Sequence, residues 1–288
     1  MKEVKVQAPA KINLTLEIVG KRVDGFHDLK SIMHTISLYD YLTVRIEQAE
    51  NLIIELSGTS DEIPYDEKNL IWKAAEKFFE ASKINNVKLS VYLEKNIPVQ
   101  AGLAGGSSDA AATLFALNHL FENILSNEQI NQICAELGSD LNFCLKGGCA
   151  ICSSRGEKVR SIPFLELPVS IVKPKCIKIS AKEAFEEYDL LENKETLNNT
   201  EKMLNLILRG QFDESLINND LETPMRKKYH PVNNMKVFLK NSYMSGSGAI
   251  FYTLTPNLDV IFEPDEFIFF ENLKTIKDGV KIVEENNV

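Results

Sequence analysis

The chain has 288 residues, which is enough to bury a substantial core in one large or two moderate domains. Its formal net charge of −9 and its lack of a Lys/Arg cluster argue against a nucleic acid as the main partner. Because no apolar run approaches a membrane span, the first residues lack a signal-peptide core and the five cysteines have no regular spacing, we expect a cytoplasmic protein without a membrane partner.

The first part of the chain alternates predicted strands with a helix. Residues 4–19 and 41–56 are rich in β-branched and apolar residues in near alternation, which predicts strands. Residues 69–83 place apolar side chains at helical spacing and predict an amphipathic helix. Residues 87–94 alternate apolar and polar side chains, which is typical of a half-buried strand.

A glycine-rich loop follows this strand and reads IPVQAGLAGGSSDAAA over residues 97–112. Its glycines are Gly102, Gly105 and Gly106. Glycine can take positive φ and lets a ligand approach the backbone closely. Ala101 and Ala104 predict ordinary backbone geometry, because a Cβ makes positive φ costly. The loop matches neither the P-loop nor the dinucleotide fingerprint, and it could also be a tight turn that lets an alanine-rich helix pack closely.

A buried helix is predicted over residues 108–121, directly after the loop. Ser107 and Ser108 suit its N-cap, and Asp109 suits its first turn. Free backbone N–H groups at such a helix start, supported by the helix dipole, form a site suited to phosphate. The order strand, glycine loop and helix therefore indicates phosphate binding.

The rest of the chain mixes strands and helices irregularly. Residues 126–137 predict a helix with Ser126 as its cap and Gly138 as its stop. Residues 153–156 form a turn-like segment, which makes a domain boundary near residue 155 plausible. The mixed order of elements favours an α+β fold over a doubly wound sheet.

One cysteine pair, Cys149 and Cys152, has the spacing of a redox or zinc motif. There is no second pair and no histidine close by in sequence, and the segment follows two glycines like a short buried strand. We therefore expect structural cysteines here and no metal site.

The C-terminal residues 256–264 contain two prolines and have poor helical prospects. Residues 267–283 could supply closing strands.

Three segments in order resemble the motifs of the GHMP kinases, a family of small-molecule kinases without a P-loop. They are residues 8–16 (APAKINLTL), the glycine loop and residues 244–251 (MSGSGAIF). Further segments are similar to the members that phosphorylate a cytidylated sugar alcohol: residues 25–29 (GFHDL), 117–120 (LNHL) and 137–143 (LGSDLNF). The resemblance covers residues 1–155 well and returns at residues 245–248.

The resemblance implies a two-domain α+β fold, with an N-terminal domain over 1–155, a C-terminal domain over 156–288 and the active site in the cleft between them. It implies ATP and Mg²⁺ as cofactors and small molecules as partners, in a monomer or homodimer. The implied reaction is phosphorylation of the 2-hydroxyl of 4-diphosphocytidyl-2-C-methyl-D-erythritol in non-mevalonate isoprenoid synthesis. A kinase of the mevalonate or homoserine type, or an inactive nucleotide-binding relative, remains an alternative.

The resemblance also implies two catalytic residues. From local sequence alone Asp140 is better interpreted as an N-terminal helix residue, but the resemblance reverses this, because the segment matches the one that holds the catalytic aspartate of the family. Lys11 and Asn13 share one face of their strand by the two-residue period, where a lysine is often merely exposed. The family places this lysine beside the aspartate, where it would lower the pKa of the substrate hydroxyl. Asn13 would then bind the methylerythritol end of the substrate.

The cytosine of that substrate would meet an aromatic–histidine pair, Phe26 and His27, by stacking and hydrogen bonding. Phe185 could cover the other face of the base or could be a core residue of an amphipathic helix. The loop residues and two others are the expected ATP contacts: Asn69, Pro98, Val99, Gln100, Ala101, Gly102, Leu103, Ala104, Gly105, Gly106, Ser107, Ser108 and Ser247. Asn69 could equally be a helix cap, and the segment around Ser247 could be a plain hairpin.

Overall fold

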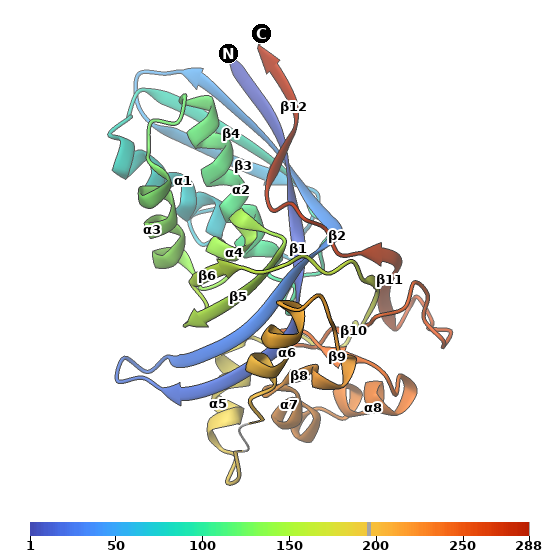
Figure 1. The fold of residues 1–288 in the computed structure, drawn as a ribbon. Coiled ribbons are helices and arrows are strands. Elements are labelled where there is room, and N and C mark those ends of the chain that lie inside the picture. Colours follow the sequence, from blue (N-terminus) through green and yellow to red (C-terminus); the bar gives the residue numbers. More distant parts are fainter. Residues whose placement is uncertain (195–196, 288) are drawn as a thin grey trace.

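The computed structural model describes residues 1–194 and 197–287. Two long strands, β1 (Lys2–Lys21) and β2 (His27–Gln48), pair antiparallel and run through the molecule from top to bottom in Figure 1. They carry the first sheet, whose main order is β12-β1-β2-β4-β3, with β5 and β6 added beside β2 and β8 beside β1. The other strands of this sheet are β3 (Ile53–Gly58), β4 (Val87–Glu94), β5 (Cys149–Ser154), β6 (Lys158–Ser161), β8 (Asn218–Asn219) and β12 (Lys281–Asn287).

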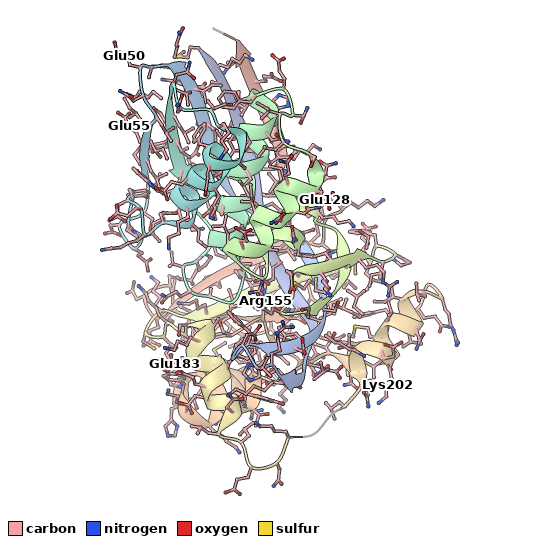
Figure 2. The ribbon with its side chains drawn as sticks, turned by 90° about the vertical axis from the view of Figure 1, so that its left-hand side faces the viewer. Glu50, Glu55, Glu128, Arg155, Glu183 and Lys202 are labelled. Carbon is pink, nitrogen blue, oxygen red and sulfur yellow. The ribbon has the colours of Figure 1, made fainter. Side chains whose placement is uncertain are left out.

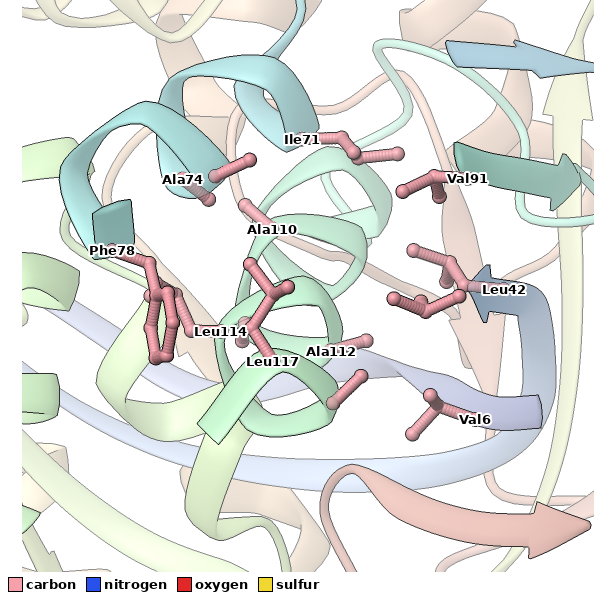
Figure 3. Close-up of a cluster of buried hydrophobic side chains, with 14 of the residues drawn as sticks. Val6, Leu42, Ile71, Ala74, Phe78, Val91, Ala110, Ala112, Leu114 and Leu117 are labelled. Carbon is pink, nitrogen blue, oxygen red and sulfur yellow. The ribbon is translucent and has the colours of Figure 1, made fainter. Parts of the chain in front are cut away.

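Helices of the first part of the chain cover one face of this sheet (Figure 1). They are α1 (Leu70–Ser82), α2 (Gly105–Leu120), α3 (Asn127–Leu137) and α4 (Leu141–Lys146). Helix α2 is buried along most of its length, and its small side chains let it lie against the sheet. Figure 3 shows Ala110, Leu114 and Leu117 of this helix between Phe78 of α1 and the sheet residue Leu42. Burial of this apolar surface is the main force that holds the helical layer on the sheet.

A second sheet, of order β11-β7-β10-β9, forms the lower part of the molecule in Figure 1. Its strands are β7 (Pro168–Pro174), β9 (Tyr243–Met244), β10 (Phe251–Thr253) and β11 (Phe267–Lys274). The helical segments of this part are α5 (Ala181–Asp189), α6 (Asn199–Ile207), η1 (Glu214–Leu216), α7 (Glu222–Lys228) and α8 (His230–Phe238). The apolar side chains of Ile12 and Leu14 in β1 pack with Ile171 and Tyr252 of this sheet. Strand β1 therefore belongs to both cores.

Several predicted elements are confirmed, and the α+β class is confirmed with them. The strand over 87–94 has the predicted bounds, and Asn69 and Ser126 cap the helices that they were expected to begin. The strand expected over 41–56 is interrupted at residues 49–52, and its first part begins as early as His27. The C-terminal segment does supply strands β11 and β12.

The chain end returns to the first sheet, because β12 pairs antiparallel with β1. Both termini accordingly lie side by side at the top of Figure 1. The domain boundary near residue 155 stays a prediction. Among the described residues, no helix combines the length and the apolar character needed to span a membrane.

Candidate active site

A cleft of about 700 Å³ opens between the elements of the two halves, a size in the range that small-molecule ligands occupy. Four segments far apart in sequence build its walls: the middle of β1, the glycine loop with the start of α2, the segment around Asp140, and the turn between β9 and β10. The start of α5 closes one side.

Lys11 lies at the base of this cleft with only 3% of its side chain exposed. Its Nζ donates to Oδ1 of Asn13 at 2.7 Å and to the carbonyl oxygen of Gly102 at 2.9 Å. The backbone N–H of Lys11 also donates to the carbonyl oxygen of Leu103 at 3.1 Å. The strand and the glycine loop therefore fix both ends of this residue.

Asn13 is the centre of a buried hydrogen-bond network beneath the lysine. Its Oδ1 also accepts the N–H of Gly246 at 3.0 Å, and its Nδ2 donates to Oγ of Ser31 at 2.8 Å. Its carbonyl oxygen accepts the hydroxyl of Tyr252 at 2.8 Å. Such a satisfied network leaves the lysine little freedom to move.

Asp140 approaches Lys11 from the other side of the cleft, with Oδ2 at 3.9 Å from Nζ and 28% of its side chain exposed. It stands directly before the short helix α4, but its side chain forms no capping hydrogen bond there. The carboxylate of Asp140 therefore faces the cleft and does not cap α4, which is the role that its position in the sequence suggested. The predicted neighbourhood of Lys11, Asn13 and Asp140 is present in the structure.

The glycine loop differs from the sequence expectation in its backbone. Helix α2 begins at Gly105 with Ala104 as its N-cap, so the expected cap at Ser107 or Ser108 is wrong, and Asp109 lies beyond the first turn. The helix starts earlier because Ala104 takes a left-handed conformation with φ of 58°. The expectation that this alanine has ordinary geometry is therefore also wrong.

The start of α2 has free hydrogen-bonding capacity toward the cleft. Its N-cap residue Ala104 supplies no side-chain hydrogen bond, so the first N–H groups are left for another acceptor. Ser107 lines the cleft, whereas the buried hydroxyl of Ser108 donates to the carbonyl oxygen of Pro9 at 2.8 Å. This arrangement fits a bound phosphate group.

The loop packs tightly against the turn between β9 and β10. A Cβ added to Gly102, which has φ of 79°, would meet the carbonyl oxygen of Ser245 at 2.0 Å. Oγ of Ser245 in turn donates to the carbonyl oxygen of Gly102 at 3.0 Å. This contact brings Ser247 to the rim of the same cleft.

Beneath α2, Lys95 forms ion pairs with two buried carboxylates, Asp40 and Asp109. Burial alone would lower the pKa of Lys95, but the charges of Asp109 and Asp40 outweigh it and raise that pKa. Burial and the charge of the neighbouring Asp40 raise the pKa of Asp109, and Lys95 opposes this shift. Asp40 also accepts the N–H groups of Asn96 and Ile97 at 2.6 and 2.8 Å, so the cluster anchors the beginning of the loop.

Asn69 caps α1 and also lines the cleft, so both interpretations of this residue are compatible with the structure. Its Oδ1 accepts the N–H of Ile71 at 2.9 Å, and its Nδ2 donates to the carbonyl oxygen of Pro64 at 2.7 Å. Of the other expected ATP contacts, residues 98–107 and Ser247 line the cleft, whereas the buried Ser108 does not.

The expected cytosine contacts are divided between the cleft and its rim. Phe185 lines the cleft, and its ring stacks on that of His27 at 4.9 Å between centroids. His27 is buried, and its Nε2 lies 2.8 Å from Oδ1 of Asp189. Phe26 is 52% exposed and lies outside the lining, under the guanidinium of Arg155, whose Cζ is 5.0 Å from the ring centre.

Sequence reasoning missed some residues of the cleft, among them Lys95, Arg155 and Ser31. Arg155 was considered only as part of a turn, and Lys95 lies just outside the glycine loop. The sequence offered a weak signal for two of them, because Ser31 lies two residues after the segment 25–29 and Lys95 lies two residues before the glycine loop.

ATP fits the donors of this site, because the free N–H groups of α2 and the glycines face the cleft. Among the described residues no group of three or more His, Cys, Asp or Glu side chains could hold a metal ion.

Comparison with known proteins gives a consistent result. Residues 69–149 match the family model of the GHMP kinases N terminal domain. The chain is 38% identical over 264 residues to the 4-diphosphocytidyl-2-C-methyl-D-erythritol kinase of Caldicellulosiruptor bescii, which covers 88% of this chain and 90% of that protein.

Solved structures show the same fold. A 4-(cytidine 5'-diphospho)-2C-methyl-D-erythritol kinase superimposes with a TM-score of 0.71 at 28% identity, over 87% of this chain and 90% of that one. A homoserine kinase from Cytophaga hutchinsonii gives a TM-score of 0.73 at 17% identity, over 98% and 97% of the two chains. Since the second likeness is at least as close in shape, the fold alone does not select the substrate.

Proposed function

The chain belongs to the 4-diphosphocytidyl-2-C-methyl-D-erythritol kinase family of the GHMP kinases, and we propose that it transfers a phosphoryl group from ATP to the 2-hydroxyl of 4-diphosphocytidyl-2-C-methyl-D-erythritol. It is a small-molecule kinase with an alcohol as acceptor, and its reaction is a step of non-mevalonate isoprenoid synthesis. The observation that carries the proposal is the approach of Lys11 and Asp140 at 3.9 Å beside the free start of α2.

Phosphoryl transfer asks a protein mainly for positioning and for stabilisation of charge. Asp140 accepts the proton of the substrate hydroxyl, because it is the carboxylate that faces the cleft beside Lys11. Lys11 stabilises the charge that develops on the attacking oxygen. Because Asn13 and Gly102 hold its ammonium group in place, this stabilisation needs no rearrangement during the reaction.

The start of α2 binds the phosphates of ATP through its N–H groups, and Ser107 and Ser247 lie beside them on the cleft wall. Asn69 lies at the adenine end. Mg²⁺ bound with ATP would neutralise phosphate charge, and Ser107, which lines the cleft, would offer it a hydroxyl oxygen. The buried cluster of Lys95, Asp40 and Asp109 keeps the loop in shape.

The cytidylated acceptor extends across the cleft. Its methylerythritol end lies at Asn13, and its cytosine lies at the aromatic side chains of Phe26, His27 and Phe185. Support for this placement comes from Phe185, which lines the cleft, and from its stacking with His27. We assign the reaction to the cytoplasm, because all five cysteines are free thiols and suit a reducing compartment.

The test is a transfer assay with purified protein, ATP and Mg²⁺, in which ADP and phosphorylated product are both measured. The cytidylated substrate should be phosphorylated, and mevalonate and homoserine should not. Transfer to homoserine or mevalonate instead would assign the chain to another acceptor. ATP binding without transfer to any of the three would identify an inactive nucleotide-binding relative.

A further inference from the structure

The proposed acceptor carries a diphosphate between its cytosine and its sugar alcohol, and this group needs a cationic partner in the cleft. None of the residues assigned so far to the acceptor, Asn13, Phe26, His27 and Phe185, is a lysine or an arginine. The question of which side chain meets the diphosphate rests on the proposed function and goes one step beyond it.

In the described part of the chain, the cationic side chains that line the cleft are Lys11, Lys68, Lys95 and Arg155. Lys11 is held beside Asp140, and Lys95 is enclosed by its two carboxylates. Lys68 precedes the cap of α1, whose first residue Leu70 lies near Gly106 of the glycine loop. Lys68 is therefore on the ATP side, and Arg155 is the remaining candidate.

Arg155 lies in the turn between β5 and β6, and contacts with the segment around Asp140 hold this turn in place. A Cβ added to Gly156 would meet Cβ of Ser139 at 3.3 Å, so the turn lies directly on the residue before Asp140. Nδ2 of Asn142 donates to the carbonyl oxygen of Glu157 at 3.2 Å, on the other side of the turn. Figure 2 shows Arg155 at mid-height, where the upper and lower parts of the molecule meet.

The strand register places Arg155 between the two ends of the acceptor. Along β2, His27 marks the cytosine end, whereas Met33 pairs with Asn13 at the sugar end. Leu29 lies between them and pairs with Ser154, the residue before Arg155. A diphosphate that links cytosine to sugar must cross this same interval.

The guanidinium of Arg155 is oriented but not neutralised. Nη2 donates to the carbonyl oxygen of Ala135 at 3.0 Å, and the group covers the ring of Phe26. Arg155 forms no salt bridge with any residue that the structure describes, so its charge is available to a ligand. A planar guanidinium can bind two phosphate oxygens at once.

We propose that Arg155 binds the diphosphate of the cytidylated acceptor and thereby selects a cytidine diphosphate compound over an uncharged alcohol. The guanidinium of Arg155 covers the ring of Phe26, which is expected to stack on cytosine. Phe26 and Arg155 would therefore recognise the base and the adjacent diphosphate together. This role makes Arg155 a specificity-determining residue.

The experiment compares the binding of cytidine and of CDP by titration calorimetry, in the wild-type protein and in Arg155→Met. The wild type should prefer CDP, and Arg155→Met should lose about 10-fold to 100-fold of that preference while its affinity for cytidine changes little. Arg155→Lys should keep part of the preference, since it retains the charge without the planar fork. Arg160→Met, at an exposed position on β6, is the matched control and should behave as the wild type.

Steady-state kinetics complete the test. Arg155→Met should raise KM for the cytidylated acceptor and leave KM for ATP unchanged. Equal losses for cytidine and CDP would mean that Arg155 only supports Phe26, and weaker ATP binding would place it on the donor; either result overturns the proposal. Thermal melts of all variants identify any that fail to fold, and Arg155→Lys then carries the comparison. A wild type that prefers CDP but does not phosphorylate the cytidylated acceptor would refute the proposed function and leave the diphosphate site standing.

Discussion

Lys11 and Asp140 face each other across the cleft with Nζ and Oδ2 3.9 Å apart, a separation longer than a hydrogen bond. The ammonium group is already held from below by Asn13 and Gly102, so it does not need the carboxylate to stay in place. The carboxylate is thus near a fixed positive charge and still free to accept a proton. This combination is what a general base for a hydroxyl requires.

Asp140→Asn should reduce kcat about 100-fold or more and leave KM for both substrates nearly unchanged, because it removes the proton acceptor but keeps the shape. The melting temperature should not fall, since the side chain forms no capping bond to α4. Single-turnover kinetics and thermal melts measure both effects. Asp265→Asn, at an exposed position that does not line the cleft, is the control. A stable Asp140→Asn enzyme with near-normal turnover would contradict the assignment.

Lys11→Met should also lower kcat, and the double variant with Asp140→Asn should lose much less than the product of the two single losses. The reason is that the lysine acts on the same proton transfer as the aspartate. A double-mutant cycle on kcat gives the interaction directly. If the two losses simply multiply, Lys11 and Asp140 work independently, and the idea of one catalytic unit is wrong.

Much of the fold follows from local sequence signals. Asn69 and Ser126 were predicted correctly as helix starts, because each side chain accepts a local capping hydrogen bond. Gly138 was predicted correctly as a helix end, because glycine is typical of that position. The proximity of Lys11 and Asp140 was predicted from the family resemblance, because no local sequence signal connects residues so far apart in the chain.

The errors lie where tertiary contacts override local preference. Ala104 takes a left-handed conformation at the start of α2, although alanine disfavours it locally. Gly105 lies directly after it, and a Cβ there would meet Nζ of Lys95 at 2.7 Å, so the buried cluster packs against the loop too closely to leave room for a side chain at this position. Arg155 went unnoticed for a similar reason, because its contacts with Ala135 and Phe26 come from distant segments.

Gly106→Ala should weaken ATP binding about 10-fold without lowering the melting temperature. A Cβ at Gly106 has its nearest neighbour, Cδ1 of Leu70, at 3.8 Å, so the protein itself accepts it, whereas a phosphate against the backbone would not. Titration calorimetry with ATP and thermal melts check both parts. Gly105→Val is the contrasting variant: its Cβ meets Lys95, so it should lose stability as well as affinity. Unchanged ATP affinity in a folded Gly106→Ala protein would show that the phosphates of ATP do not bind at this loop.

Phe26→Ala should raise KM for the cytidylated acceptor about 5-fold to 100-fold, as loss of a base–aromatic stack does elsewhere. ATP affinity and melting temperature should stay nearly constant, because the ring is 52% exposed and contributes little to the core. Kinetics with each substrate varied in turn measure the separation. An equal loss for both substrates would indicate misfolding, and no loss for either would move the cytosine away from this ring.

Asp220 gives a prediction about pH and stability. Burial and, to a smaller extent, the charge of Glu17 raise its pKa to about 6, although it accepts the N–H of Ile18 at 2.8 Å, which lowers the pKa. The folded state therefore holds this proton at pH values where the unfolded chain has released it, so the stabilisation is complete below about pH 4 and is lost as the pH rises through about 6. Asp220→Asn keeps the acceptor for Ile18 but has no proton to lose.

The variant should accordingly melt close to the wild type near pH 4 and above it at pH 7, by about 2–4 °C if the buried charge costs about 1 kcal/mol. Because all other acidic groups are common to the two proteins, the difference between their melting temperatures isolates Asp220. Melts at intervals from pH 4 to pH 7.5 measure this difference, with Asp265→Asn as the exposed control. A difference that stays constant, or that shrinks as the pH rises, would show that Asp220 carries its charge in the folded protein at neutral pH without a cost to stability.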